Sequence, residues 1–307
     1  MSTPHSPRWT MTGGRTLLPA PFIVAGIVNI TPDSFSDGGR YVKPEAAMER
    51  IRRIVAEGAA MVDIGAESTR PGAEDIGHTE EWRRLAPVLE QTLAERNGRT
   101  DADPAAFYSV AVDTFRADTA AKALSMPGPG VDVINDVSGG SFDPGMDEVL
   151  ATCKPGYVLG HSPALPAFMQ QSPRYDNVVD ELMCWFSTRM RVLVKAGLPE
   201  DRICLDPCIG FGKTLEHTLS IIDEIPRFLS LGRPLYFGIS RKSFLGAITG
   251  SAVSGRDSAT QAATALLARA GVAVHRVHQV AETVNTLKIV RAFDRLPSSV
   301  IYPVEVN

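Results

Sequence analysis

Short apolar runs alternate with amphipathic segments along most of the chain. The apolar runs predict strands at Phe22–Val28, Met61–Ile64, Tyr108–Val112, Val131–Ile134, Tyr157–Leu159, Ile203–Leu205, Leu235–Ile239 and Val272–Val277. The amphipathic segments predict helices at about Pro44–Glu57, Thr79–Arg96, Arg116–Leu124, Asp143–Thr152, Arg174–Ala196, Leu215–Asp223, Asp257–Ala270 and Gln279–Phe293. A helix therefore follows each strand throughout the chain.

This alternation predicts an α/β fold. Strands with a nearly continuous apolar character, each followed by a helix, indicate a parallel sheet that helices cover. A full set of such units in 307 residues favours one (β/α)8 TIM barrel. A doubly wound open sheet is the second choice, because its first strand would lead into Gly-x-Gly-x-x-Gly, whereas Asn-Ile-Thr-Pro-Asp follows here. We expect a single domain over residues 1–307, with residues 1–21 as an extension that contains a short hairpin around Gly13 and Gly14.

Composition excludes several classes of protein. Hydrophobic residues make up 44% and charged residues 21% of the chain, as in ordinary globular proteins. The formal net charge is −4 and no basic run occurs, so we expect no nucleic-acid partner. No signal peptide and no run of about 20 apolar residues is evident, so we expect no membrane partner. The four cysteines show neither a metal-binding nor a disulfide pattern, which favours a reducing, cytoplasmic compartment.

Polar residues stand at the carboxyl end of every predicted strand, where barrel enzymes build their active sites. Along the chain they are Asn29, Glu67, Thr69, Arg70, Asp113, Asn135, Asp136, His161, Asp206, Ser240, Arg241, Lys242, Arg276 and His278. Their convergence on one end of the barrel points to a binding site there.

Several of these residues also have a purely structural interpretation. Asp113 is suited to capping the next helix, and Asp206 and the pair Asn135–Asp136 are suited to turns. His161 is equally consistent with a hydrogen-bonded structural residue. His275 lies on the opposite face of its strand from the residues at the barrel mouth, so we expect it to be structural.

Two glycine-containing motifs do not match known phosphate or nucleophile motifs. "GFGKT" at 210–214 lacks a Walker A glycine, because Pro207 stands where that motif requires one. We therefore expect Lys213 to be a solvated loop lysine. "GISRK" lacks the second glycine of Gly-x-Ser-x-Gly, which excludes a nucleophile elbow.

The residues at the barrel mouth suit a flat heterocycle with an anionic substituent. Asp113, Asn135 and Asp206 supply acceptors, and Lys242 and Arg276 supply donors. A carboxylate meets the amino-amide edge of a pterin or guanine through paired hydrogen bonds. In the preceding loops, Arg70 suits an anionic leaving group, and Asn29 is an oxygen ligand suited to Mg²⁺.

Seven segments closely resemble one family, the dihydropteroate synthases among the pterin-binding barrel enzymes. They are "GIVNITPDSFSDGG", "DIGAESTRPGA", "VAVDT", "INDVSGG", "DPCIGFGKT", "GISRKSFLG" and "RVHQVAET", spread from Gly26 to Thr283. The resemblance implies an enzyme that joins 6-hydroxymethyl-7,8-dihydropterin diphosphate to p-aminobenzoate. The products would be 7,8-dihydropteroate and diphosphate, in folate biosynthesis.

The resemblance also implies the site residues. Those with a catalytic role would be Lys242, Arg276, His278 and Asp113. The pterin pocket would consist of Asp113, Asn135, Asp206, Lys242 and Arg276, and the p-aminobenzoate pocket of Phe35, Thr69, Arg70, Pro71, Lys242 and Ser243. Diphosphate would be held by Arg276, by His278 and by Mg²⁺ on Asn29. Members of the family commonly form homodimers through helices on the barrel flank. The apolar segment 259–274 suits such a contact, but its pattern would equally serve packing in the barrel core.

Three positions depart from the family pattern. Gly160 and Ser162 stand where methionines usually flank the histidine of the fifth strand, and Cys208 stands where glycine is usual. We expect a looser apolar wall in the pterin pocket and a changed turn at Cys208. Two alternatives stay open: a methyltransferase that uses methyltetrahydrofolate and a corrinoid protein, and a non-catalytic pterin-binding paralogue.

Overall fold

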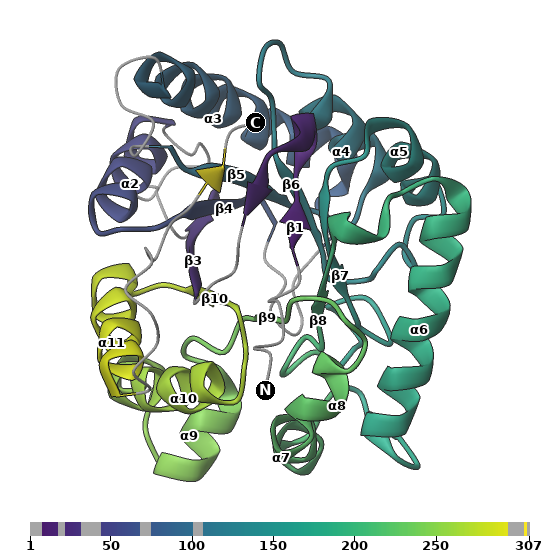
Figure 1. The fold of residues 1–307 in the computed structure, drawn as a ribbon, viewed down its shortest axis with the longest axis vertical. Coiled ribbons are helices and arrows are strands. Elements are labelled where there is room, and N and C mark those ends of the chain that lie inside the picture. Colours follow the sequence, from purple (N-terminus) through teal and green to yellow (C-terminus); the bar gives the residue numbers. More distant parts are fainter. Residues whose placement is uncertain are drawn as a thin grey trace.

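The computed structural model describes residues 8–17, 22–31, 44–67, 75–100 and 107–293, and the backbone of 304–305. Eight parallel strands form one sheet with the order β8-β7-β6-β5-β4-β3-β10-β9 (Figure 1). Their bounds are β3 Ile23–Asn29, β4 Met61–Gly65, β5 Ser109–Asp113, β6 Val133–Asp136, β7 Gly156–Gly160, β8 Ile203–Asp206, β9 Tyr236–Phe237 and β10 Val274–Val277. A parallel bridge between Leu205 and Leu235 joins the two edges of this sheet. The (β/α)8 barrel predicted from the sequence is confirmed.

All eight predicted helices are present around the barrel. They are α2 Pro44–Ala56, α3 Gly77–Thr100, α4 Ala117–Leu124, α5 Met146–Cys153, α6 Val178–Ala196, α7 Leu215–Asp223, α10 Asp257–Arg269 and α11 Val280–Phe293. Two short helices, α8 (Ile225–Leu229) and α9 (Ser243–Thr249), were not predicted, because five to seven residues carry too little periodicity. Within the described ranges, no helix is long and apolar enough to cross a membrane.

Local sequence signals set the bounds of several helices. The side chain of Asn177 accepts hydrogen bonds from the backbone N–H groups of Val179 and Asp180 and so caps the start of α6. Gly197, with φ at 123°, ends the same helix. Thr214 caps α7 through the backbone N–H of His217.

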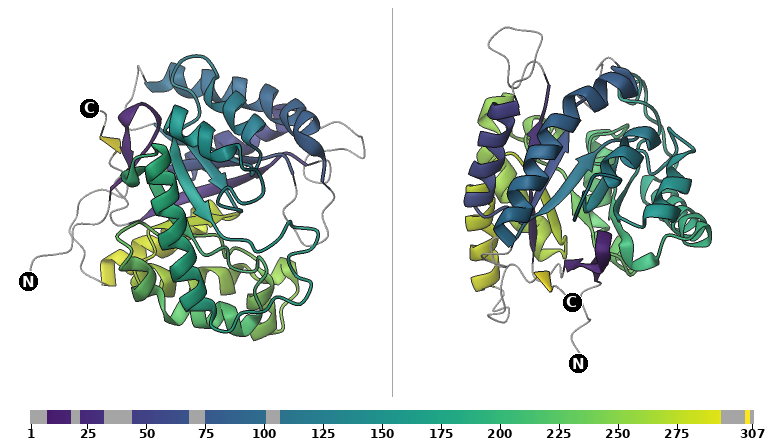
Figure 2. Two further views of the ribbon diagram at one scale, coloured as in Figure 1. Left: turned by 90° about the vertical axis from the view of Figure 1, so that its right-hand side faces the viewer. Right: turned by 90° about the horizontal axis from the view of Figure 1, so that it is seen from above.

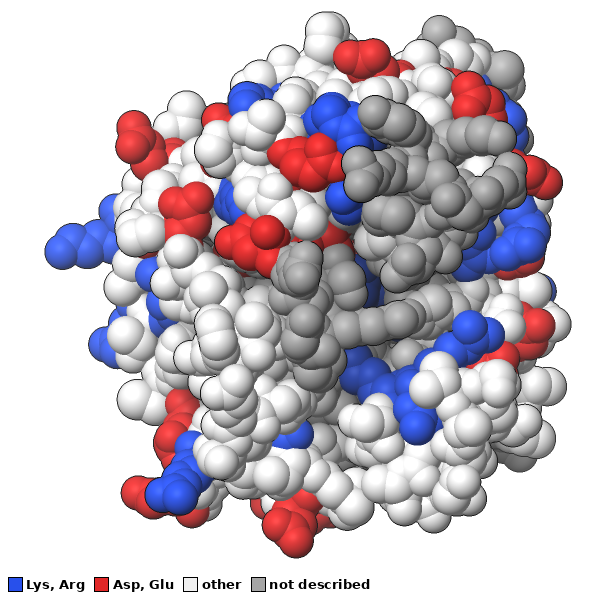
Figure 3. Space-filling model, turned by 180° about the vertical axis from the view of Figure 1, so that it is seen from behind, with Lys and Arg blue, Asp and Glu red and all other residues white. Residues whose placement is uncertain are grey.

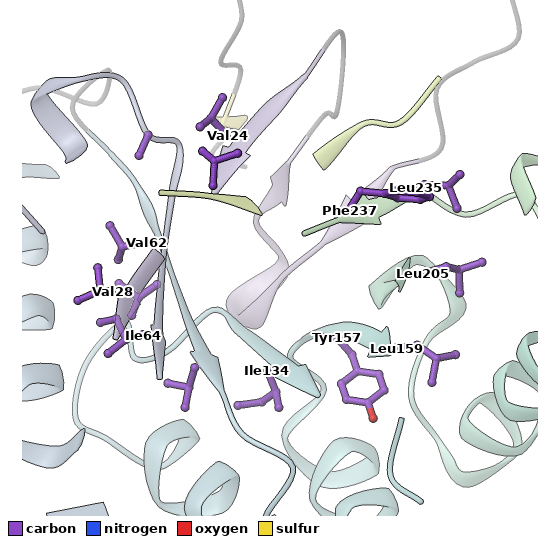
Figure 4. Packing of buried hydrophobic residues seen from close by; sticks show 14 of the residues in the cluster. Val24, Val28, Val62, Ile64, Ile134, Tyr157, Leu159, Leu205, Leu235 and Phe237 are labelled. Atoms are coloured by element: carbon purple, nitrogen blue, oxygen red, sulfur yellow. The ribbon is translucent and has the colours of Figure 1, made fainter. Parts of the chain in front are cut away.

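Buried apolar side chains form two layers, one on each face of the barrel wall. In the outer layer, Val62, Ile64 and Leu159 point from the strands towards the surrounding helices (Figure 4). The inner layer includes Ala25, Ala111, Val133, Val158, Cys204 and Val274. The alternation of side chains along each strand separates the two layers.

The predicted hairpin covers the amino-terminal end of the barrel (Figures 1 and 2). It pairs β1 (Trp9–Thr10) with β2 (Thr16–Leu17), and Gly13 and Gly14 between them have positive φ angles of 72° and 79°. A third strand, β11 (Val304–Glu305), joins β2, which the sequence did not predict. Trp9 is buried in the inner layer, and its indole N–H donates to the carbonyl oxygen of Arg202 at 2.8 Å. The hairpin therefore closes this end of the barrel.

A buried ion-pair cluster around Asp132 ties the hairpin to the barrel. The Asp132 carboxylate accepts hydrogen bonds from Arg15 of the hairpin and, at 2.5 Å, from Nη1 of Arg96 in α3. It also accepts the backbone N–H of Val110 in β5 at 2.8 Å. The side chains of Asp132 and Arg96 are both 0% exposed, so the charge of the Arg96 guanidinium depends on this carboxylate for compensation.

We expect Asp132→Ala to lower the free energy of unfolding by about 3–5 kcal/mol, because it leaves the buried Arg96 guanidinium without a carboxylate. Chemical denaturation of both proteins measures the difference. Arg227→Ala is the control: Arg227 pairs with Asp180 at 2.7 Å, but the side chains are 45% and 57% exposed. The control is expected to cost about 1 kcal/mol or less. Equal losses in the two variants would contradict the role of the Asp132 cluster.

Candidate active site

A pocket opens at the barrel mouth, the end of the barrel at the carboxyl ends of its strands. Its lining contains five of the predicted residues together with an apolar wall and one glycine: Asp113, Asn135, Asp206, Lys242, Arg276, Val137, Cys208, Phe211 and Gly238. Figure 3 shows Lys and Arg side chains in a hollow on the corresponding face of the molecule. The convergence expected from the ends of the strands is therefore present.

Arg276 of β10 lies inside the barrel between two carboxylates. Its Nε donates to Asp63 of β4, and its Nη2 donates to Oδ2 of Asp113 of β5 at 2.5 Å. Asn135 of β6 also donates to Oδ2 of Asp63, at 3.1 Å. One guanidinium thus links three strands and fixes two acid side chains.

Asp63 was not among the site residues predicted from the sequence. Asp63 is fully buried in the middle of the apolar strand Met61–Gly65 and faces the barrel interior. An ionisable side chain in a strand that is buried on both faces needs a charged partner, and this signal was present in the sequence. Its partner, Arg276, lies 213 positions away, so only the folded barrel identifies the pair.

The carboxyl of Asp113, which lines the pocket, has a raised pKa. Burial raises its pKa to about 7, although the neighbouring Arg276 acts in the opposite direction. Gly65 on the adjacent strand leaves room for the carboxylate, because a Cβ atom there would lie 3.2 Å from Cβ of Asp113. Arg116, not Asp113, occupies the cap position of α4. The helix-cap interpretation of Asp113 is therefore wrong.

Asp206 and Lys242 both line the pocket, and their opposite charges attract each other. Oδ1 of Asp206 accepts the backbone N–H of Cys208 at 2.7 Å, so the predicted turn role is also met. Lys242 donates to the carbonyl oxygen of Ile209, and its Nζ lies 4.2 Å from the centre of the Phe211 ring. Burial lowers the pKa of Lys242 to about 8 and raises that of Asp206, and the attraction between the two opposes both shifts.

The structure separates the roles of Asn135 and Asp136. Asn135 faces the pocket, whereas Asp136 faces away and accepts hydrogen bonds from Ser138, Gly140 and the Tyr157 hydroxyl at 2.7–2.8 Å. The turn interpretation is correct for Asp136. His275 is fully buried beside Phe22, outside the pocket, as expected.

Lys213 is buried, so the expectation of a solvated lysine is wrong. Its Nζ lies 3.0 Å from the carbonyl oxygen of His161, 2.9 Å from that of Phe211 and 3.3 Å from Nδ1 of His161. Burial lowers the pKa of His161 to about 3, and the Lys213 charge acts in the same direction. His161 is therefore a neutral residue that joins two loops, which agrees with its structural interpretation.

Two of the three departures from the family pattern, Gly160 and Cys208, lie together beside the pocket. A Cβ atom on Gly160 would lie 2.5 Å from the carbonyl oxygen of Asp136 and 2.9 Å from Sγ of Cys208. Cys208 has a φ of 52°, in the left-handed region that favours glycine. Val137, Cys208 and Phe211 form the apolar side of the pocket, so such a wall is present without a methionine.

The other predicted residues lie around the barrel mouth. His278 follows β10, and its Nδ1 lies 2.9 Å from the Ser240 hydroxyl oxygen. Ser243 is exposed at the start of α9, and Asn29 is half-buried at the end of β3. The predicted residues Phe35, Thr69, Arg70 and Pro71 lie outside the described residues. Among the described residues, no cluster of three or more His, Cys, Asp or Glu side chains could hold a metal ion.

Arg116 links Glu67 to Asp75, the residues on either side of the segment 68–74. Its Nη1 donates to Glu67 and its Nη2 to Asp75, each at 2.5 Å. Glu81 lies 3.2 Å from the same guanidinium. Glu67, which also follows a strand, therefore serves a structural role at the base of this loop.

Comparisons with known proteins agree with this geometry. Residues 25–278 match the family described as "Pterin binding enzyme". The dihydropteroate synthase of Mycobacterium leprae is 37% identical over 281 residues, covering 89% of this chain and 94% of that protein. The solved structure of Xanthomonas albilineans dihydropteroate synthase with 4-aminobenzoic acid is 36% identical, with a TM-score of 0.84, and covers 95% of this chain and all of that one. A structure of the same enzyme in complex with 7,8-dihydropteroate has a TM-score of 0.81 at 34% identity, with 95% of this chain and 100% of that chain covered.

The pocket, its charged side chains and these similarities lead to one family. The chain belongs to the pterin-binding enzymes and, among them, to the dihydropteroate synthases.

Proposed function

We propose that this chain condenses 6-hydroxymethyl-7,8-dihydropterin diphosphate with p-aminobenzoate and releases diphosphate. The observation that carries the proposal is the pocket in which Asp113, Asn135 and Asp206 face Lys242 and Arg276. The structures of the Xanthomonas albilineans relative with 4-aminobenzoic acid and with 7,8-dihydropteroate support the choice of substrates.

The carboxylates in the pocket recognise the pterin edge. Asp113 and Asp206 accept ring and amino N–H groups, and Asn135 supplies both a donor and an acceptor. The planar Arg276 guanidinium, held by Asp63 and Asp113, presents a fixed surface for the ring. Because these partners are positioned before the substrate arrives, binding requires little reorganisation.

Departure of the diphosphate is the difficult step, and positive charge at the barrel mouth assists it. Arg276 and His278 stabilise the negative charge that develops on the leaving group. Asn29 would hold Mg²⁺, since this ion needs only one or two protein oxygens when substrate phosphates and water complete its shell. When bound, Mg²⁺ would supply further charge neutralisation on the leaving group.

The nucleophile needs no strong base. The amino nitrogen of p-aminobenzoate is uncharged at neutral pH and carries its own lone pair. We assign a dissociative substitution, in which the carbon left behind is a cation conjugated with the pterin. Asp113 and Asp206, which bind the ring N–H groups, stabilise that positive charge.

The p-aminobenzoate pocket is assigned to Phe35, Thr69, Arg70, Pro71, Lys242 and Ser243. Lys242 and Ser243 are adjacent at the start of α9, on the same side of the barrel mouth as the pterin pocket. The pairing of Arg116 with Glu67 and Asp75 supports the proposal, because it fixes both sides of the loop that contains Thr69, Arg70 and Pro71.

We also propose that the protein acts as a cytoplasmic homodimer. Apolar side chains are exposed on the helices near the carboxyl end of the chain: Leu266 of α10 is 69% exposed, Ile248 of α9 58% and Ile289 of α11 57%. Exposed apolar side chains on neighbouring helices suit burial against a second copy. All four cysteines are free thiols, which is consistent with a reducing compartment.

A diphosphate-release assay with and without p-aminobenzoate tests the activity. Release should require p-aminobenzoate, and both Lys242→Ala and Asp206→Ala should abolish it, because each removes a charge from the pterin pocket. Full activity in either variant would refute the site assignment. Pterin binding without coupling would favour a non-catalytic paralogue, and tight binding of methyltetrahydrofolate without diphosphate release would favour a methyltransferase.

Pterin binding should depend on pH through Asp113. The pKa of about 7 means that its carboxyl is largely protonated in the empty pocket below pH 7, whereas the bound pterin requires the charged acceptor. Affinity for hydroxymethyl-dihydropterin should therefore fall about tenfold per pH unit below 7 and level off between pH 7 and the pKa of Lys242 at about 8. Calorimetry in buffers of different ionisation enthalpy measures the released proton. Asp113→Asn should bind weakly and without this dependence; an unchanged pH profile in that variant would contradict the prediction.

Asn29→Ala should increase the Mg²⁺ concentration needed for half-maximal diphosphate release by at least about tenfold, because the ion loses its protein oxygen. The affinity for hydroxymethyl-dihydropterin, which lacks the diphosphate, should not change. Titration of both proteins with MgCl₂ measures the shift. Equal Mg²⁺ requirements would show that Asn29 is not the ligand.

A further inference from the structure

The turn that precedes Lys242 has an unusual backbone conformation. The backbone N–H of Lys242 donates to the carbonyl oxygen of Ile239 at 3.1 Å, which closes a four-residue turn with Ser240 and Arg241 at its centre. Arg241 has a φ of 59°, in the left-handed region. In turns whose third residue has a positive φ, that residue is usually glycine, since a side chain there is unfavourable.

The start of α10 holds Arg241 in this conformation at three points. Its backbone N–H donates to the Thr260 hydroxyl at 3.1 Å, and its carbonyl oxygen accepts from Nη1 of Arg256 at 3.0 Å. Its guanidinium meets Asp257 with two parallel hydrogen bonds, at 2.7 and 2.9 Å. Gln279 donates to the same carboxylate at 3.1 Å, which orients it.

The neighbours of Arg241 on both sides belong to the candidate site. Ser240 contacts Nδ1 of His278 at 2.9 Å, and Lys242 lines the pterin pocket. A change of conformation at Arg241 would rotate the peptide planes on both sides and move both side chains. Left-handed strain at a functional site persists only where the surroundings enforce it.

We propose that Arg241, clamped by Asp257, is a positioning residue whose task is to hold the left-handed turn that aims Ser240 at His278 and Lys242 into the pterin pocket. This inference rests on the proposed function, and it names the turn that sets the geometry of the pterin pocket. Arg241 acts through its backbone conformation, so its guanidinium needs no contact with substrate. The side chains of Arg241 and Asp257 are each about one third exposed. Their ion pair therefore fixes the geometry of the turn but contributes little to the stability of the fold.

Comparison of Arg241→Gly with Arg241→Ala isolates this role. Both variants lose the guanidinium and the ion pair, but glycine adopts the left-handed conformation without the steric penalty that alanine meets. That penalty corresponds to a population difference of about 5- to 30-fold. We therefore expect kcat/KM for the pterin diphosphate to decrease in the order wild type, Arg241→Gly, Arg241→Ala, with the two variants separated by about that factor.

Two further measurements complete the experiment. Asp257→Asn should reduce kcat/KM in the wild-type background and have little further effect in Arg241→Gly, because its partner is already absent. Binding of hydroxymethyl-dihydropterin, followed by fluorescence, should show the same order of variants. This readout needs no coupling to p-aminobenzoate, so it separates a failure of the positioning role from a failure of the proposed function.

Arg227 provides the matched control. It also pairs with an aspartate, Asp180, but it lies in the right-handed helix α8 and is not part of the pocket lining. Arg227→Gly and Arg227→Ala should leave kcat/KM and pterin binding unchanged, and thermal unfolding of all variants reports whether they fold. Equal activity and binding in Arg241→Gly and Arg241→Ala would overturn the proposal and indicate a direct role for the guanidinium. Additive losses from Asp257→Asn and Arg241→Gly would likewise overturn it.

Discussion

The guanidinium of Arg276 is buried between the carboxylates of Asp63 and Asp113, and the barrel mouth is organised around this contact. One positive charge compensates two acids that would otherwise repel each other in a low-dielectric interior. The contact joins β10 to β4 and β5, so it fixes where these strands place their side chains. Asn135, which donates to Asp63, extends the same network to β6.

The same charges prepare the pocket for its substrate. Burial raises the pKa of Asp113 to about 7 and lowers that of Lys242 to about 8, so both groups are poised near neutral pH. Shifts of this kind, in which burial outweighs the opposing charge of a neighbour, are typical of functional sites. The amino-terminal hairpin closes the opposite end of the barrel through Trp9 and through the Asp132 cluster.

Structural lysine and arginine residues support the site from outside the pocket. Lys213 joins the loops after β7 and β8 by donating to the carbonyl oxygens of His161 and Phe211. Arg241, held by Asp257, fixes the turn that leads to Lys242. Lys213 reaches the loop after β7, and Arg241 reaches the start of α10. Long side chains therefore contribute to the rigidity of the barrel mouth, as the strands do.

The sequence by itself determined the order of the elements and most of the pocket. Continuous apolar strands require cover on both faces, and eight strand–helix units leave few arrangements other than a barrel. Because the carboxyl ends of parallel strands converge, Asp113, Asn135 and Asp206 could be grouped without coordinates. Only the tertiary structure decided which polar groups face one another. The pairing of Asp63 with Arg276 and the left-handed turn at Arg241 depend on register and on contacts between distant segments, which local periodicity does not encode.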